Sequence, residues 1–314
     1  MYPSEEAVAV TLERVTVRVP ATVANLGAGF DVLAAAVGVH AEVTLAPADR
    51  PRVVVAGADV PQDGSNLVYR SAAAAAASLG YRGAFALTAT SPIPLRSGLG
   101  SSAAAIVGGV VAATRLLGAA PEPDRLLALA AQIEGHPDNV AAALIGGVVV
   151  VARDEVGLRW AKVTPALPLA VALAVPELEI ETGQARQFLP AQVSREDAVF
   201  NLGQVALLVA ALAQGRGDLL RRALGDRLHQ PYRAALVPGF DEVVAAAREA
   251  GAYGAVLSGS GPTVAALAPP EAAAAAGAAM QEAFRRVGVA SRAIVTAIEP
   301  RGALDDAPDA ARDA

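Results

Sequence analysis

The feature that most constrains the fold is a glycine-rich string at residues 92–104, Pro-Ile-Pro-Leu-Arg-Ser-Gly-Leu-Gly-Ser-Ser-Ala-Ala. Residues 84–91 before it have the apolar pattern of a strand, and residues 101–117 after it have that of a helix stopped by Gly118. The pattern therefore predicts a strand that leads into a helix through a loop whose glycines let the backbone come close to a ligand.

A loop of this kind is suited to binding phosphate. The first amides of a helix have no partners within the helix, and they lie at the positive end of its dipole. Both properties favour a polyphosphate, and the hydroxyls of Ser101 and Ser102 can also bind phosphate or hold a magnesium ion. The alternative is a structural turn with Ser101 as its N-cap. The proline lead and the double serine favour phosphate binding.

The lysine content argues against the two largest classes of ATP-using proteins. Lys162 is the only lysine of the chain, and it lies in Trp-Ala-Lys-Val-Thr-Pro with no glycine loop before it. A P-loop protein needs Gly-Lys-Ser/Thr, and a protein kinase needs a strand lysine on the phosphates. Neither of these two classes is therefore expected for this chain.

Charge and composition exclude further classes. A net charge of −6 and an aromatic content of 4% argue against nucleic-acid binding, which needs basic surfaces and stacking side chains. The chain has no cysteine, so it has no disulfide, thiolate metal site or cysteine nucleophile. Residues 1–16 lack a signal pattern, and the uncharged run at residues 101–114 is too short to span a bilayer. We expect a cytoplasmic protein without membrane partners.

Strands and helices alternate along the chain, which indicates an α/β or α+β protein. The 314 residues, 54% of them hydrophobic, suffice for about two domains, and Pro-Ala-Leu-Pro at residues 165–168 is the best candidate for the boundary. Predicted strands cover residues 16–20, 39–45, 52–56, 84–91, 148–153, 158–163, 169–175, 255–257, 263–267 and 290–298. Predicted helices cover residues 66–79, 101–117, 124–134, 195–213 (after Ser194 as N-cap), 240–249 and 270–287.

Three further segments gather polar or flexible residues. Residues 20–31 leave a strand and place Asn25 and Asp31 among small apolar residues, although an ordinary turn has the same composition. Residues 134–139, Glu-Gly-His-Pro-Asp-Asn, suit metal binding or proton transfer, with a polar loop at a helix end as the alternative. One histidine and no cysteine make magnesium a better candidate there than zinc. Residues 257–263 form a glycine turn between apolar strands, a pattern shared by ordinary hairpins.

Together these four segments resemble the GHMP kinase family, and in their order they cover most of the chain. Residues 92–104 are similar to the family's ATP loop, and residues 258–263 to its C-terminal glycine motif. Within the family the resemblance is greatest to the members that phosphorylate L-homoserine. It extends over residues 20–31, 134–139, 145–147, 182–190 and 226–233, with Val23, Ala34 and Ala142 as departures from the usual serine, glycine and proline.

The resemblance implies an α+β fold of two domains. The N-terminal domain, residues 1–165, would resemble the second domain of ribosomal protein S5 and bind ATP. The C-terminal domain, residues 166–300, would be ferredoxin-like. Independently of the resemblance, the aspartates and small residues at 301–314 predict a disordered tail. The active site would lie between the two domains, near the start of the helix at Ser101.

The resemblance also implies roles for individual residues. Ser102 and Glu134 would hold Mg²⁺ between the β- and γ-phosphates of ATP, and Asn139 would occupy the catalytic position where some relatives have an aspartate base. The residues that would bind the nucleotide are Asn66, Pro92, Ser97, Gly98, Leu99, Gly100, Ser101, Ser102 and Ala103. Those of the substrate pocket are Asn25, Asp31, His136, Asp138, Arg186 and Arg233, and those of the glycine motif are Ser258, Gly259, Ser260, Gly261 and Thr263.

The implied reaction is transfer of a phosphoryl group from MgATP to the hydroxyl of L-homoserine, a step towards threonine. Arginine forks suit a carboxylate and Asp31 suits an ammonium, so Arg186, Arg233 and Asp31 together fit an amino acid. Two alternatives stay open: a family kinase for mevalonate or a diphosphocytidyl polyol, and a catalytically silent sensor. A polyol would not need these three charges, and a sensor would not need the metal ligands. A homodimer is also left open.

Overall fold

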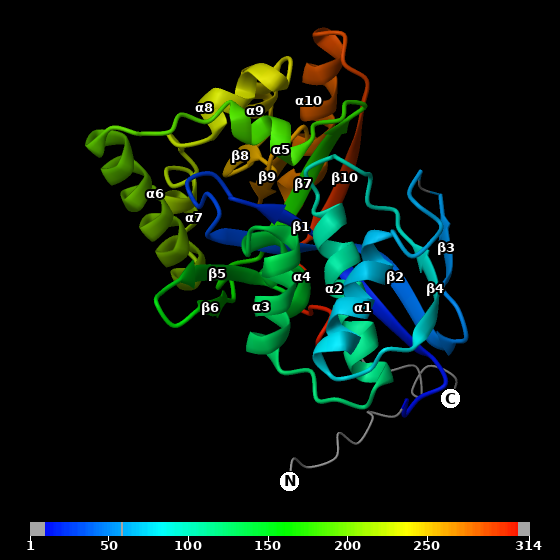
Figure 1. Ribbon diagram of the computed structural model, residues 1–314. Coiled ribbons are helices and arrows are strands. Elements are labelled where there is room, and N and C mark those ends of the chain that lie inside the picture. The colour runs from blue at the N-terminus through cyan, green and yellow to red at the C-terminus, as the bar shows by residue number, and fades with distance from the viewer. Residues whose placement is uncertain (1–9, 58, 307–314) are drawn as a thin grey trace.

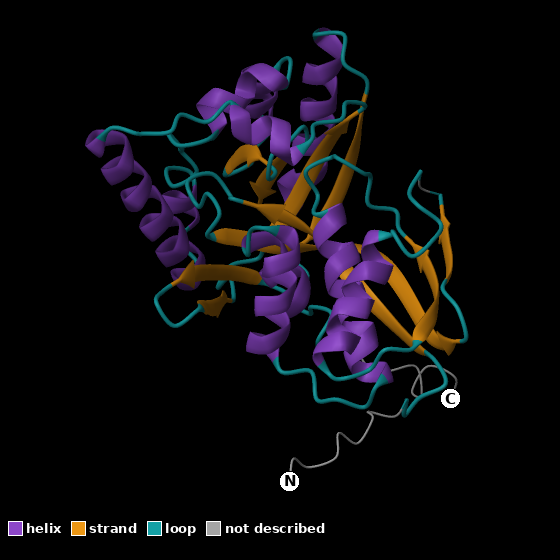
Figure 2. Ribbon diagram, viewed as in Figure 1, coloured by secondary structure: helices purple, strands orange, loops and turns teal. Residues whose placement is uncertain are grey.

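The structure is a computed structural model that describes residues 10–57 and 59–306. These residues form two sheets with helices packed against them, as Figures 1 and 2 show. The α+β expectation is confirmed, because the second sheet is wholly antiparallel and the first has a single parallel pair.

The first sheet has six strands in the order β3-β4-β2-β5-β6, with β1 paired to β2 outside this path. Its long central strand, β2, pairs with β1, β4 and β5 along different parts of its length. Residues of β1 alternate between buried and half-buried over Val15–Arg18 and are then all buried, because the strand passes into the interior. The strands are β1 (Val15–Ala24), β2 (Leu33–Ala48), β3 (Arg52–Ala56), β4 (Ala84–Thr90), β5 (Val148–Arg153) and β6 (Leu158–Val163).

The helices of the first half pack around α2, which begins at the end of the glycine-rich string at residues 92–104. Almost every residue of α2 after its first turn is buried, which explains its apolar composition. It contacts α1, α3 and α4 as well as β1 and β2. Small side chains, mostly alanine and glycine, allow this close packing on all sides. The helices are α1 (Leu67–Ser78), α2 (Ser101–Leu116), α3 (Pro123–Glu134) and α4 (Asp138–Ile145).

The second sheet is antiparallel with the order β10-β7-β9-β8, and α9 and α10 pack against it. In Figure 1 the long helix α6 lies at the left edge of the molecule, away from α10. The strands are β7 (Ala170–Pro176), β8 (Gly254–Leu257), β9 (Val264–Ala268) and β10 (Ser291–Ala297). The helices are α5 (Thr182–Gln187), α6 (Arg195–Gln214), α7 (Gly217–Leu220), α8 (Gln230–Arg233), α9 (Phe240–Glu249) and α10 (Pro270–Arg286), with a 3₁₀ turn at Ala234–Leu236.

Strong local signals predicted most of these elements. Ser194 is the N-cap of α6, as predicted, and its Oγ accepts a hydrogen bond from the Asp197 amide at 3.0 Å. Local signals missed the end of β1 beyond Pro20, because there the alternation of apolar and polar residues gives way to continuous burial. They also missed α4, whose first turn lies in the polar segment that the sequence suggested was a loop.

The predicted disordered tail is wrong for residues 301–306. Ala303 is fully buried, and its amide donates to the carbonyl of Ala143 at 3.0 Å. Arg115 in α2 donates to the carbonyls of Ala303 and Leu304 at 3.0 and 2.9 Å. The small residues that suggested disorder are instead the ones that fit against the end of α4. Residues 307–314 lie outside the described residues.

One helix, α6, is long and apolar enough to cross a membrane by length and composition alone, with 22% of its most apolar window buried. A single helix of this kind is weak evidence, since helices of soluble proteins pass the same test. Asn201 of α6 donates to the carbonyl of Ala28 and to Asp226, which anchors the helix to the rest of the chain. The predicted absence of membrane partners stays a prediction.

Candidate active site

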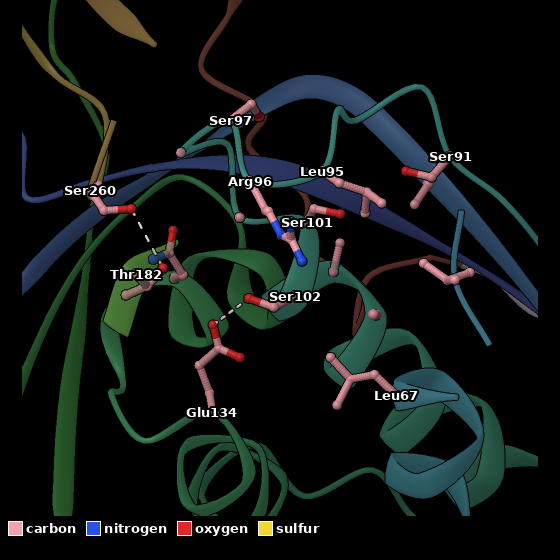
Figure 3. Close-up of a pocket in the computed structure, with 18 of the residues that line it drawn as sticks. Leu67, Ser91, Leu95, Arg96, Ser97, Ser101, Ser102, Glu134, Thr182 and Ser260 are labelled. Carbon is pink, nitrogen blue, oxygen red and sulfur yellow. Dashed lines mark hydrogen bonds between the residues drawn. The ribbon is translucent and has the colours of Figure 1, made fainter. Parts of the chain in front are cut away.

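A cavity of about 640 Å³ lies where the glycine-rich string at residues 92–104 meets elements of both halves of the chain. Its wall is made by the end of β1, the loop before α2, the turn between α3 and α4, α5, α8 and the glycine turn after β8. Figure 3 shows Ser102 and Glu134 on one side of this space, with Thr182 and Ser260 beside them and Leu67 and Ser91 at the other end.

The start of α2 faces the cavity without a side-chain cap. The N-cap is Gly100, in the left-handed conformation at φ 69°, so Ser101 is the first helical residue and not the cap. The first amides of α2 therefore have no side-chain partner, and they lie at the positive end of a helix of sixteen residues. This arrangement favours phosphate binding over the purely structural turn.

The glycine turn after β8 supports the phosphate loop from behind. Ser258 Oγ donates to the carbonyl of Gly98 at 2.6 Å, and the Thr263 amide donates to the carbonyl of Ser97 at 3.1 Å. A Cβ on Gly98 would overlap the Ser258 carbonyl, so this close approach requires glycine. The two predicted glycine motifs thus form one structure across the two halves of the chain.

Backbone strain gathers in the same region. Among the described residues, four that are not glycine have a positive φ: Asn25, Leu26, Asp31 and Arg96. All four belong to the segments at residues 20–31 and 92–104. Positive φ is costly for residues with side chains and occurs most often at functional sites. The site thus coincides with the part of the chain where the backbone departs from ordinary geometry.

Ser102 and Glu134 form the candidate metal pair. Ser102 Oγ donates to Glu134 Oε1 at 2.6 Å, as the dashed line in Figure 3 shows. Burial raises the pKa of Glu134, while the Ser102 hydrogen bond and the charge of His136 oppose the shift. Within residues 10–57 and 59–306 no group of three or more histidine, aspartate or glutamate side chains is placed to hold a metal. A metal ion here would take its other ligands from phosphate and water.

His136 bridges the two carboxylates of the turn between α3 and α4. Its Nδ1 lies 3.0 Å from Asp138 Oδ1 and its Nε2 lies 3.8 Å from Glu134 Oε1. Burial lowers the pKa of His136, but the Asp138 hydrogen bond and the charges of Asp138 and Glu134 outweigh it and leave the pKa above its usual value. In its protonated form the imidazole compensates for two carboxylates at the cavity wall.

Asp31 and Arg186 are bound to each other. Both guanidinium NH groups of Arg186 donate to the Asp31 carboxylate, at 2.9 and 2.7 Å. Asp31 itself does not line the cavity, whereas Arg186 does. The predicted ligands for an ammonium and for a carboxylate thus form one bidentate pair at the cavity edge.

Arg233 is the cation with the least compensation in the site. It is 1% exposed, its NH1 donates to the carbonyl of Gly259 at 3.2 Å, and its Nε is buried without a partner among the described residues. Burial and the charge of Arg186 lower the pKa of Arg233. The Phe30 ring lies between the two arginines, 5.5 Å from the Arg186 guanidinium and 5.2 Å from that of Arg233. A buried cation facing a cavity favours an anion there.

Three asparagines of the predicted site have distinct surroundings. Asn25 Nδ2 donates to the carbonyl of Gly259 at 3.0 Å, which links residues 20–31 to the glycine turn. Asn139 Oδ1 accepts a hydrogen bond from Thr22 at 2.6 Å. Asn66 is the N-cap of α1 and also donates to the Pro61 carbonyl at 2.7 Å. Its side-chain oxygen and nitrogen are both bound to backbone groups, so the contact with adenine stays a prediction.

The structure brings most of the predicted site residues to one cavity. Those that line it are Asn25, Asn66, Ser97, Gly98, Gly100, Ser101, Ser102, Glu134, His136, Asp138, Asn139, Arg186, Arg233, Gly259 and Ser260. Those that do not line it are Asp31, Pro92, Leu99, Ala103, Ser258, Gly261 and Thr263. The buried side chains of Leu99 and Ala103 belong to the core, and Pro92 is exposed.

Sequence reasoning missed residues that support the site from behind. Thr22, Phe30 and Asp226 lie inside segments that the sequence singled out, but they had no assigned role. Asp226 accepts hydrogen bonds from three successive amides before α8, which carries Arg233. Thr182 of α5 also lines the cavity. For Thr22 the only signal was its place in a polar segment, because its partner Asn139 is 117 positions away. Asp226 carried a local signal, an aspartate two to four residues before the amides that it caps.

This fold and cavity match a known family. Residues 66–147 match the model of the GHMP kinase N-terminal domain and residues 208–286 match that of the GHMP kinase C-terminal domain. The chain belongs to the GHMP kinase family. The curated homoserine kinase of Carboxydothermus hydrogenoformans is 44% identical over 296 residues, covering 93% of this chain and 96% of that protein. The homoserine kinase of Deinococcus radiodurans is 47% identical over 253 residues, covering 79% and 82%.

Solved structures agree with this placement. The crystal structure of homoserine kinase from Cytophaga hutchinsonii has a TM-score of 0.86 at 37% identity, over 94% of this chain and 98% of that one. A Streptococcus pneumoniae phosphomevalonate kinase in complex with phosphomevalonate and AMPPNP has a TM-score of 0.68 at 15% identity, over 90% and 99%. The second likeness shows the shared fold alone.

Proposed function

We propose that this protein transfers the γ-phosphoryl group of MgATP to the hydroxyl of L-homoserine, forming O-phospho-L-homoserine and ADP on the way to threonine. The observation that supports an amino-acid substrate is the environment of Arg233. Its guanidinium is fully buried and faces the cavity, and its hydrogen-bond partner is the backbone carbonyl of Gly259. A substrate carboxylate would supply the missing negative charge. Relatives named homoserine kinase, 41–47% identical, support the same substrate.

The nucleotide would be held by the uncapped start of α2. Amides between Gly98 and Ser102 would bind its phosphates, because they face the cavity at the positive end of the helix dipole. The pair of Ser102 Oγ and Glu134 Oε1 offers two hard oxygen ligands 2.6 Å apart. Mg²⁺ prefers such ligands and keeps its remaining positions for phosphate and water. When bound, the ion would neutralise charge on the β- and γ-phosphates.

The amino acid would lie beside the phosphates, on the side of α5 and α8. Its carboxylate would bind Arg233 and the edge of Arg186. Its ammonium would bind Asp31 once the Asp31–Arg186 pair opens, because Asp31 does not line the cavity and both its oxygens are bound by Arg186. The side-chain hydroxyl would then point towards Asn139 and the γ-phosphate. Phosphoryl transfer depends mainly on positioning and charge stabilisation, and this arrangement of fixed charges supplies both.

We propose that transfer proceeds without a strong general base. Asp138, beside Asn139 on α4, is the candidate base. Its Oδ1 already lies 3.0 Å from His136 Nδ1 and accepts a hydrogen bond from the Asn139 amide at 2.8 Å. The substrate oxygen would form its bond to the γ-phosphorus as the bond to ADP breaks, and its proton would pass to a phosphoryl oxygen or to water. A loose transition state tolerates this late proton loss.

The chain organisation fits this proposal. We propose an ATP-binding domain at residues 1–165 and a second domain at residues 166–300, with the substrate bound between them. The two sheets fall on either side of this boundary. Cytoplasmic location and a homodimer stay predictions.

The first test measures ADP release from MgATP by the purified protein. The panel contains L-homoserine, mevalonate, galactose and L-serine, with a blank that lacks an acceptor. We expect turnover with L-homoserine alone. Turnover with mevalonate or galactose alone would keep the kinase and contradict the amino-acid site. ATP binding without any turnover would favour the silent sensor.

The second test replaces Arg233 by methionine. We expect the KM for L-homoserine to rise about 10- to 100-fold, the order that a lost hydrogen bond to a charged group supports, while the KM for ATP changes little. Arg221→Met is the control, because Arg221 is an exposed arginine of the same half that contacts Tyr253 and the Ala252 carbonyl outside the cavity. An unchanged KM in Arg233→Met would exclude Arg233 as the carboxylate ligand.

A further inference from the structure

Thr22 and Asn139 form a contact whose chemical consequence extends the proposed function. Thr22 lies near the end of β1 and is fully buried, and its Oγ1 donates to Asn139 Oδ1 at 2.6 Å. Asn139 is the second residue of α4 and lines the cavity, whereas Thr22 stands behind it. Thr22 can therefore reach a substrate only through Asn139.

The surroundings of Thr22 leave its side chain little freedom. Its amide donates to the carbonyl of Leu99 at 3.1 Å, which ties β1 to the phosphate loop. A Cβ on Gly100 would overlap Thr22 Oγ1 and would lie 3.2 Å from Asn139 Oδ1. Thr22, Gly100 and Asn139 therefore meet at the point where the phosphate loop becomes α2.

We infer that Thr22 is a positioning residue that turns the Asn139 amide so that its NH₂ group faces the cavity. A buried hydroxyl needs an acceptor for its proton, and Asn139 Oδ1 is the one recorded for Thr22 among the described residues. An amide whose oxygen is bound on one side presents its two N–H donors on the other. This inference rests on the proposed function and deepens it.

The orientation decides what Asn139 can do. As a donor it holds the substrate hydroxyl oxygen, or an oxygen of the transferring phosphoryl group, and it does not accept the hydroxyl proton. A donor at this place steers the oxygen towards the γ-phosphorus and stabilises the charge that spreads over the phosphoryl oxygens. The same amide in the opposite orientation would repel those oxygens. Thr22 therefore acts on the chemical step more than on binding.

The test compares Thr22→Val with Thr22→Ser. Valine keeps the shape of threonine without the hydroxyl, whereas serine keeps the hydroxyl. The measurement is the rate of L-homoserine phosphorylation in a single turnover, which separates the chemical step from product release. We expect Thr22→Val to lower this rate about tenfold, the order that one lost hydrogen bond supports, with the Kd for L-homoserine within about twofold. Thr22→Ser should keep most of the rate.

A double-mutant cycle with Asn139→Ala identifies the route of the effect. In Asn139→Ala the side-chain amide that Thr22 orients is absent. Adding Thr22→Val to this variant should therefore change the single-turnover rate by less than about twofold. Thr16→Val is the matched control: Thr16 is on the same strand, but its Oγ1 pairs with Thr44 Oγ1 at 2.9 Å. We expect this control to keep the full rate.

Three outcomes would overturn the inference: equal effects of Thr22→Val with and without Asn139, equal loss in Thr22→Ser, or a loss confined to the Kd for L-homoserine. If Thr22→Val does not fold, Thr22→Ala, which also removes the hydroxyl, decides the same question in the two Asn139 backgrounds. Failure of the proposed function is separate, because it would appear as absence of L-homoserine turnover in the unsubstituted protein.

Discussion

At the scale of single residues, the site compensates its buried charges with one another. Arg186 is paired with Asp31, and His136 with Asp138 and Glu134, while Arg233 is left for an anion. Burial penalises every unpaired charge, and a close opposite charge offsets that penalty. The pKa of His136 is raised by its carboxylate partners, whereas burial lowers the pKa of His229 and of His40.

The pH dependence of stability near neutrality follows from these histidines. The pKa of His136 lies above the ordinary value of 6.5, so its contribution is complete below that pH and is lost as the pH rises through the folded-state pKa. Burial above all lowers the pKa of His229 and of His40, so their contributions are present above pH 6.5 and are lost as the pH falls. We expect the free energy of unfolding in urea to decline on both sides of this pH.

Replacement of His136 separates the two declines. His136→Asn should flatten the decline above pH 6.5 and keep the decline below it, where His229 and His40 act. The pKa of Glu134 is raised above its ordinary value of 4.5, so its contribution is complete below that pH and is lost as the pH rises through the folded-state pKa. The measurement is the free energy of urea unfolding across the neutral range for both proteins. An equally steep decline at high pH in His136→Asn would contradict the assignment.

Residue types at the site could be predicted from the sequence, but their partners could not. The composition of residues 134–139 predicted a polar site, and Glu134 and His136 do line the cavity. Local patterns could not predict that Asp31 is bound by Arg186, 155 positions away. Pairings over such distances are set by the packing of whole elements, which local patterns do not encode.

At the scale of elements, a buried aspartate organises the turn that carries Arg233. Asp226 is fully buried and accepts hydrogen bonds from the amides of Leu228, His229 and Gln230 at 2.6–3.0 Å and from Asn201 Nδ2 at 2.7 Å. These bonds hold the start of α8 against α6. The helix has four residues, so its position depends on this cap more than on its own hydrogen bonds.

Substitution of Asp226 should therefore affect both stability and substrate binding. We expect Asp226→Ala to lower the free energy of unfolding by at least about 3 kcal/mol, because it leaves several buried donors unpaired. The KM for L-homoserine should rise, since Arg233 loses its fixed position. Asp226→Asn keeps one acceptor oxygen, so its free energy of unfolding and its KM should lie between those of Asp226→Ala and of the unsubstituted protein.

Asp154 provides the matched control for this prediction. It accepts hydrogen bonds from the amides of Val156 and Gly157, both at 2.8 Å, in the exposed turn between β5 and β6. Asp154→Ala exposes these amides to water, so it should have a much smaller effect on unfolding and none on KM. Equal losses in the two variants would show that burial of Asp226 is not the cause.

Strands and helices with regular patterns were predictable, whereas the short elements of the site were not. The long helices α2, α6 and α10 have strong start and stop signals, such as Ser194 before α6. The four residues of α8 and the first turn of α4 lie among polar residues and prolines that also suit loops. Their helical form depends on tertiary contacts, which outweigh weak local preference.

At the scale of the whole molecule, the end of the described chain returns to the first half. Glu299 donates its amide to the Ala36 carbonyl at 2.9 Å, and the Leu304 amide donates to the Leu144 carbonyl at 3.1 Å. Residues 301–306 thereby pair with the last turn of α4 and provide acceptors for Arg115. The helix that carries Asn139 and Asp138 is thus held at both ends, by β1 and by this segment.

Gly302 is the point of closest approach in this contact, and its substitution tests the contribution of the segment. A Cβ on Gly302 would overlap the Leu144 carbonyl, which is backbone and cannot rotate away. We expect Gly302→Ala to lower the free energy of urea unfolding by about 1–3 kcal/mol, the usual cost of overpacking. Gly203→Ala on α6 is the matched control, because a Cβ there meets nothing within 4 Å. It should instead raise stability by about 0.5–1 kcal/mol through helix propensity. Glycine-to-alanine substitution should therefore have opposite effects on stability at the two sites. Unchanged stability in Gly302→Ala would show that residues 301–306 do not support the fold.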